Sequence, residues 1–235
     1  MRIATAAVLT AFLFAGCGGS SNFTLNQNYE NKDFSDKVLL IAPIANDAVK
    51  VVIKEDVIRD FPKDKREPEA IIKDMVYNSI TKYAGEHLTG VKIYKAALDS
   101  SLFLSQYDKS RYFRLSEPLD NHELLPFNYV PRKEVLNSSN IKPNLILVIN
   151  RLQFGRAIHT FSTGANPVQS FITSGLTGEY EFILFDYDKN EIVAVGGSTA
   201  DFSSTYTMAR TKWDGIIMEI VPEIFSNMTF FMSNQ

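Results

Sequence analysis

Cysteine is nearly absent from this chain, because Cys17 is the single cysteine among 235 residues. No disulfide can therefore form within one copy of the protein, although oxidising compartments usually favour paired cysteines. An unpaired thiol is a liability in such a compartment unless its sulfur is already consumed. The lone cysteine makes the residues around position 17 the first place to look for function.

An excess of one sign of charge is also lacking. The chain has 24 basic and 27 acidic residues, and Arg2 is the only charged residue within residues 1–16, so loss of that segment would leave 23 basic against 27 acidic residues. A mildly acidic protein has no electrostatic reason to bind nucleic acid or an anionic lipid surface. We therefore expect no nucleic-acid partner.

The apolar run at the start of the chain is too short to cross a membrane. It extends over Ile3–Phe14, after the single positive charge of Arg2, and the small residues Ala15-Gly16 follow it. A spanning helix needs roughly 20 apolar residues, whereas a charged start, a short apolar stretch and small residues at the cut are typical of a secretory signal. We therefore predict that residues 1–16 are a signal peptide.

The four residues Phe14-Ala15-Gly16-Cys17 resemble the lipobox of bacterial lipoprotein signal peptides. In that family the peptidase cuts before the cysteine, whose sulfur carries a diacylglycerol and whose freed amine is often acylated. The family usually has Leu three positions before the cysteine, where this chain has Phe14. The resemblance implies a lipid on Cys17 as the membrane anchor; the alternative is a chance cysteine in an ordinary cleaved signal.

The same resemblance implies a location in the cell envelope. Gly18, rather than Asp, follows the lipidated position, which resembles the pattern of lipoproteins sent to the outer membrane where that sorting rule operates. We expect an outer-membrane protein that faces the periplasm, with the inner membrane as the alternative.

The remainder of the chain divides into two segments. Residues 17–35, which start with Cys17, are polar and rich in Gly, Ser and Asn, and we interpret them as a flexible tether. Residues 36–235 are expected to form a single α/β domain. It opens with a continuous apolar strand at Val38–Ile44. Residues 45–66 are ambiguous, with a possible strand at Val49–Ile53.

One helix and one weaker region follow. Pro68 suits a first helical position, and the apolar residues after it recur at helical spacing up to Gly85, a plausible end signal. We expect a strand at Val91–Tyr94 and a short helix over residues 97–107. Residues 108–142, which are punctuated by prolines, are expected to be irregular.

The C-terminal half has the strongest patterns. A second buried strand is predicted at Asn144–Ile149, and a β-hairpin over residues 179–201, turning at Asp186–Asn190. An apolar stripe then predicts a closing helix that reaches Phe225, with Pro222 kinking it or starting a new turn. The members of the stripe are Trp213, Ile216, Ile217, Ile220, Val221, Ile224 and Phe225.

This order of elements predicts an α/β fold, a mixed β-sheet with packed helices in a two-layer or three-layer sandwich, with a C-terminal β-hairpin followed by a long helix. Val38–Ile44, Leu145–Ile149, the hairpin and the closing helix together resemble a domain shared by the N-terminal part of TolB and several envelope lipoproteins. Those lipoproteins include the curli-secretion lipoproteins and the activators of peptidoglycan synthases. The resemblance implies a similar fold, and it carries over no functional residue.

Motifs for metal or cofactor chemistry are missing. The three histidines, His87, His122 and His159, have no metal-ligand spacing. Gly196-Gly197 lies in or after a strand, without the strand–loop–helix context of a phosphate-binding loop. We expect neither a metal nor a cofactor.

Candidate catalytic carboxylates have simpler explanations. Asp186 and Asp188 belong to a sequence that hairpin turns prefer, and Glu179 and Glu181 would share a solvated strand face. No Gly-x-Ser-x-Gly elbow is present. We therefore assign no catalytic residue, although catalytic groups can converge from distant positions.

Residues 155–178 are the most unusual segment, because they are uncharged after Arg156 and rich in Gly, Ser and Thr. We interpret them either as a mobile loop between strands or as a contact loop in which Phe161 and Phe171 order against a partner. A pair of membrane-spanning strands is disfavoured because Pro167 and the glycines interrupt the regular alternation that such strands need.

Together these patterns favour a non-enzymatic envelope lipoprotein that assists assembly, secretion or cell-wall synthesis through protein–protein contacts. Its partner would be another envelope protein or a second copy. A lipid-anchored binding protein for a small envelope ligand is the alternative, and a hydrolase is a further one.

The anchor gives the first testable prediction. Cys17→Ser should leave the precursor uncut after residue 16 and shift any processed protein to the soluble periplasm, because each buried methylene adds ~0.8 kcal/mol of membrane affinity and two or three acyl chains anchor stably. Metabolic labelling with a palmitate analogue measures this. Equal labelling of the wild type and the Cys17→Ser variant would contradict lipidation at that sulfur.

Overall fold

The computed structural model describes residues 22–29, 32–34, 36–88, 90–95, 107–108, 130–131, 143–162, 170–189, 191–202, 209–226 and 228. The signal peptide, Cys17 and His122 lie outside these residues. So do residues 97–106 of the predicted short helix and most of the predicted irregular region 108–142.

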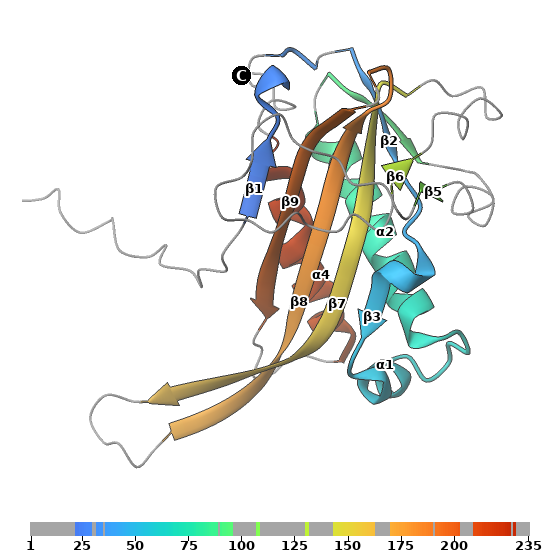
Figure 1. The fold of residues 1–235 in the computed structure, drawn as a ribbon. Coiled ribbons are helices and arrows are strands. Elements are labelled where there is room, and N and C mark those ends of the chain that lie inside the picture. Colours follow the sequence, from blue (N-terminus) through green and yellow to red (C-terminus); the bar gives the residue numbers. More distant parts are fainter. Residues whose placement is uncertain are drawn as a thin grey trace, which may run out of the picture.

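A seven-stranded mixed sheet forms the centre of the molecule (Figure 1). Its order is β1-β9-β8-β7-β2-β4, and β3 lies beside β7. Strand β2 is parallel to β4 and to β7, β3 is parallel to β7, and the other pairs are antiparallel. The mixed sheet confirms the predicted fold class. Its strands are β1 (Asn22–Leu25), β2 (Val38–Ile41), β3 (Val49–Val51), β4 (Lys92–Lys95), β7 (Leu145–Ser162), β8 (Ser170–Asp186) and β9 (Glu191–Phe202).

Shorter elements accompany the sheet. Strands β5 (Tyr107–Asp108) and β6 (Val130–Pro131) pair with each other in a separate two-stranded sheet. Two single-turn 3-10 helices, η1 (Gln27–Tyr29) and η2 (Asn46–Ala48), occur near the N-terminal strands.

Three α-helices are described: α1 (Lys54–Asp60), α2 (Pro68–His87) and α4 (Ala209–Ser226). The two long helices, α2 and α4, lie together behind one face of the sheet in Figure 1, so the described part of the domain has two layers. Pro68 is the first residue of α2, as predicted, since a proline there loses no helical hydrogen bond. Gly85 lies inside the last turn rather than after it.

The closing helix α4 packs its apolar stripe against the sheet as predicted. Every member of the stripe is at most 1 % exposed. Pro222 neither ends the helix nor starts a new element, because α4 continues to Ser226. Gly178 of β8 permits the close approach, since a Cβ there would lie 2.6 Å from the Cδ1 atom of Ile220.

The hairpin between β8 and β9 is confirmed, and its carboxylates hold the turn. Asp186 Oδ1 accepts a hydrogen bond of 2.9 Å from the backbone N–H of Lys189. Asp188 Oδ2 accepts one of 3.0 Å from the side-chain amide of Asn144. The first bond is a local turn interaction, and the second joins the turn to Asn144, 44 residues earlier in the chain, so both aspartates have structural partners.

The predicted tether extends too far along the chain. Asn22–Leu25 forms β1 and pairs antiparallel with β9, and Tyr29 and Phe34 are buried, with 1 % and 3 % exposure. The Tyr29 hydroxyl donates a 2.9 Å hydrogen bond to Asp186 Oδ2. Backbone pairing and two aromatic side chains stabilise this polar stretch, so the domain includes Asn22 and does not begin at residue 36.

The predicted loop at residues 155–178 is also wrong. Residues 155–162 belong to β7 and residues 170–178 to β8, and the two strands stay paired from Leu145↔Asp186 to Ser162↔Ser170. Pro167 falls between the strands, outside the described residues, so it does not interrupt the alternation of either strand.

None of the helices in the described residues is both long enough and apolar enough to span a membrane.

The stripe of α4 generates a stability prediction. Ile220→Asp should abolish stable folding, because Ile220 is fully buried and an unpaired buried carboxylate costs several kcal/mol, comparable with the ~5–15 kcal/mol that stabilises a whole domain. Ile217→Asp should behave alike. Glu219→Lys, at an exposed position of the same helix, is the control and should leave the thermal midpoint nearly unchanged. Similar midpoints for all three variants would contradict the packing described above.

Candidate functional site

Strands β7 and β8 extend beyond the rest of the sheet as a two-stranded ribbon (Figure 1). Pairing with β3 ends at Phe154, and pairing with β9 ends at Leu176. Beyond these points β7 and β8 pair only with each other among the described residues, out to Ser162↔Ser170. We call residues 155–162 and 170–176 the ribbon; at its base Arg156 lies opposite Leu176, which still pairs with Phe202 of β9.

The sequence of the ribbon explains why it is strand rather than loop. Each of its halves contains one threonine, one isoleucine and one phenylalanine, and β-branched and aromatic residues favour the extended backbone. Its register places Phe161 directly opposite Phe171. Opposite positions of an antiparallel pair share one face, so the structure brings the two predicted contact residues to one position near the end of the ribbon.

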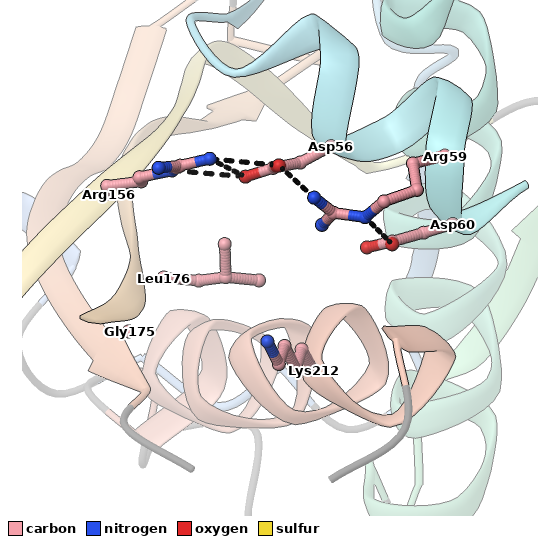
Figure 2. A pocket seen from close by; sticks show the side chains of 7 residues that line it. All are labelled: Asp56, Arg59, Asp60, Arg156, Gly175, Leu176 and Lys212. Atoms are coloured by element: carbon pink, nitrogen blue, oxygen red, sulfur yellow. Dashed lines mark hydrogen bonds and ion pairs between the residues drawn. The ribbon is translucent and has the colours of Figure 1, made fainter. Parts of the chain in front are cut away.

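An ionic cluster lies at the base of the ribbon, where β7 passes α1 (Figure 2). Arg156 of β7 donates three hydrogen bonds of 2.9–3.1 Å from Nε and Nη2 to both carboxylate oxygens of Asp56 in α1. The side chain of Asp56 is only 11 % exposed. Charge-assisted paired hydrogen bonds of this kind are stronger than neutral ones, so this contact ties the ribbon to α1.

Arg59 continues the cluster along α1. Its Nη1 lies 2.9 Å from Asp56 Oδ1, and its Nε lies 3.1 Å from Asp60 Oδ1. The hydrogen bond to Asp60 and the charge of Asp56 raise the pKa of Arg59 above its usual value. Asp60 also accepts a 3.0 Å hydrogen bond from the indole N–H of Trp213 in α4. The cluster thereby joins β7, α1 and α4.

A cavity of about 170 Å³ lies beside this cluster, between the ribbon and α4. It is smaller than the roughly 300–1,000 Å³ pockets that hold drug-sized ligands. Its lining is mostly charged, and it includes Lys212 of α4, for which no ion pair is present among the described residues. The lining residues are Asp56, Arg59, Asp60, Arg156, Gly175, Leu176 and Lys212.

Sequence reasoning did not find this cluster. Its α1 members fall in the ambiguous region 45–66, where Asp56 and Arg59 three residues apart were the only available signal. Arg156 lies 100 residues further along the chain, and a single sequence gives no sign of a pairing over that separation.

The described histidines lie in different elements, and the two glutamates form surface ion pairs. His87 is the last residue of α2, where its ring stacks on Tyr83 with centroids 4.0 Å apart, and His159 is in β7. Glu179 and Glu181 both pair with Arg151 at the surface. In the part of the chain that the structure describes, no three His, Cys, Asp or Glu side chains are grouped as metal ligands would be.

No protein-family model matches the sequence, and no curated protein matches it. Among solved structures, the chain is similar to the PelC dodecamer from Paraburkholderia phytofirmans (10 % identity, TM-score 0.37, covering 93 % of this chain and 100 % of that chain). It is also similar to protein XCC0632 from Xanthomonas campestris (12 % identity, TM-score 0.42, covering 85 % of this chain and 89 % of that chain). A third similar structure is lipoprotein GNA1162 from Neisseria meningitidis (11 % identity, TM-score 0.37, covering 81 % of this chain and 99 % of that chain).

These similarities are distant and structural, with no sequence-level family. No residue and no activity is transferred to this chain from them, and the finer resemblance to TolB and the curli-secretion lipoproteins stays a prediction.

The ionic cluster generates a prediction with a matched control on the same strand. Arg156→Ala should lower the free energy of unfolding by about 1–3 kcal/mol, because it removes a charged partner from the mostly buried Asp56. Arg151→Ala breaks only surface ion pairs and should cost at most about 1 kcal/mol. Urea denaturation measures both values. A larger loss for Arg151→Ala than for Arg156→Ala would contradict the role assigned to the cluster.

Proposed function

We propose that this chain is a non-enzymatic envelope lipoprotein that acts through protein–protein contacts made by its ribbon. A lipid on Cys17 holds it at the membrane, with the outer membrane as the expected location. Its role is accessory, in assembly, secretion or cell-wall synthesis. The observation that carries the proposal is the projecting ribbon, residues 155–162 and 170–176, which beyond Leu176 has no further strand beside it among the described residues.

The backbone of the ribbon supports a contact role. An isolated two-stranded hairpin is only marginally stable in water, and a strand without a neighbour presents unpaired N–H and C=O groups to other chains. Adding a strand to such an edge is a common mode of protein recognition. A partner that pairs with the ribbon would therefore satisfy these groups and order both chains.

The composition of the ribbon supports the same role. Beyond Arg156 it holds no Lys, Arg, Asp or Glu, whereas charged residues are a usual protection of exposed edges against pairing. Phe161 and Phe171 lie at one register position, and aromatic side chains often supply most of the binding energy of an interface. The partner is a second copy of this chain or another envelope protein.

The runner-up is a lipid-anchored binding protein for a small envelope ligand. The charged cavity at the base of the ribbon favours this candidate, although about 170 Å³ accommodates only a small molecule. A hydrolase is the third candidate, for which the sequence supplies no catalytic residue.

The proposal predicts that the two phenylalanines are dispensable for folding and required for association. A Phe161→Ser/Phe171→Ser double variant should keep a thermal midpoint near that of the wild type, while cross-linked complexes in native membranes disappear. If both rings served only the core, each truncation would cost roughly 3 kcal/mol or more and the midpoint would collapse.

A matched control removes exposed apolar groups elsewhere. Ile58→Ser/Met218→Ser changes two side chains that are 60 % and 59 % exposed, and it should leave both the midpoint and the complexes unchanged. A stable phenylalanine variant that still forms all of its complexes would remove the ribbon from consideration as a contact site. Mass spectrometry of the cross-linked species separates self-association from a second protein.

A further inference from the structure

The cavity at the base of the ribbon has more hydrogen-bond donors than acceptors. Arg59 uses Nε and Nη1 on the two aspartates, and Arg156 uses Nε and Nη2 on Asp56. Arg59 Nη2 and Arg156 Nη1 have no partner among the described residues. A guanidinium has five N–H donors and an ammonium has three, so the three basic side chains of the lining keep several donors unused.

The charge of the lining is also unbalanced. Arg59, Arg156 and Lys212 carry three positive charges, whereas Asp56 and Asp60 carry two negative charges. Both carboxylates are already engaged by guanidinium groups, and Asp60 in addition by the indole of Trp213. The excess of one positive charge therefore lies with Lys212, on the side of the cavity that faces the two arginines (Figure 2).

We infer that this cavity is a binding site for a small carboxylate anion, held between Lys212 on α4 and the two arginines at the base of the ribbon. One negative charge neutralises the excess positive charge of the lining. The two oxygens of a carboxylate accept hydrogen bonds from the unused arginine N–H groups and from the ammonium group. Leu176 and Gly175 provide an uncharged wall beside it.

A carboxylate fits this lining better than a phosphate group does. Phosphate carries up to two negative charges near neutral pH, which would leave an uncompensated charge close to Asp56 and Asp60. Like charges at short range repel each other by ~1 kcal/mol even in water, and by more near a protein surface. The planar carboxylate also matches the fork of donors that arginine presents.

An occupant of this site would contact four elements at once. Arg156 belongs to β7, Gly175 and Leu176 to β8, Arg59 to α1 and Lys212 to α4. A bound carboxylate therefore joins the base of the ribbon to the body of the domain. The inference does not depend on the proposed association, because it concerns a small molecule on one copy of the chain.

Trp213 provides a reporter for the test. It is the only tryptophan of the chain, and its indole N–H bonds to Asp60, which lines the cavity. Its indole resonance in a proton–nitrogen NMR spectrum is therefore unique and close to the site. The probes are acetate and succinate, titrated into the folded protein at constant ionic strength, with inorganic phosphate and sodium chloride as comparison salts.

The wild type should show a saturable shift of the Trp213 indole resonance with acetate and succinate, and a weaker response to phosphate. Lys212→Gln should weaken carboxylate binding about tenfold or more, since it removes the unpaired charge. Lys82→Gln, at an exposed position of α2, is the matched control and should bind as the wild type does.

Three results would overturn the inference. The first is that neither carboxylate shifts the Trp213 indole resonance in a saturable way. The second is an equal shift in the Lys212→Gln variant and the wild type, and the third is a stronger response to phosphate than to both carboxylates. A thermal melt of each variant shows whether the fold is intact. If Lys212→Gln fails to fold, the Lys212→Met variant replaces it. The responses of the wild type to acetate, succinate, phosphate and chloride then test the inference together with that variant.

Discussion

The antiparallel pairing of β7 with β8 is the interaction on which the rest of the structure depends. Strands β2 and β3 pair with β7, and β9 pairs with β8. The β7–β8 pair therefore joins the two halves of the described sheet to each other. Apolar side chains such as Leu147 and Leu184, which lie opposite each other, are fully buried in its inner half. In the outer part, beyond Leu176, β7 and β8 pair only with each other among the described residues, so the same pair forms both the centre of the sheet and the ribbon.

Local patterns in the sequence predicted the elements whose stability comes from nearby residues. The stripe from Trp213 to Phe225 and the turn at Asp186 were identified correctly, because side chains three or four residues apart, or facing across a turn, determine them. Strand β1 and the ribbon were missed, since their extended conformation depends on partners far along the chain: Asn22 pairs with Gly197. Polar and small residues conceal such strands, because their sequence alone does not distinguish backbone pairing from solvation. The same applies to Asp56 and Arg156, whose pairing no local pattern indicates.

The ionic cluster has two consequences that are compatible with each other. Its hydrogen bonds connect α1 to the base of the ribbon and to α4. Its unused N–H donors also make the base of the ribbon the proposed binding site for a carboxylate. Among the described residues the ribbon has no neighbouring strand beyond Leu176, which suits it to the proposed contact with another protein, and a small anion at its base would act on the same region. The proposed protein contact and the proposed carboxylate site therefore concern one region of the molecule.

Because the domain begins at β1, the proposed lipid on Cys17 would hold it close to the membrane. Four residues lie between Cys17 and Asn22, so the chain takes five residue steps from one to the other, and an extended chain spans at most about 3.6 Å per step. An acyl group on Cys17 would therefore hold Asn22 within roughly 18 Å of the bilayer surface. A linker of this length would restrict the orientation of the domain relative to the membrane. The β1 side of the sheet would stay close to the lipid headgroups, and neighbouring copies on the same leaflet would share one height above the membrane, which confines their encounters to two dimensions.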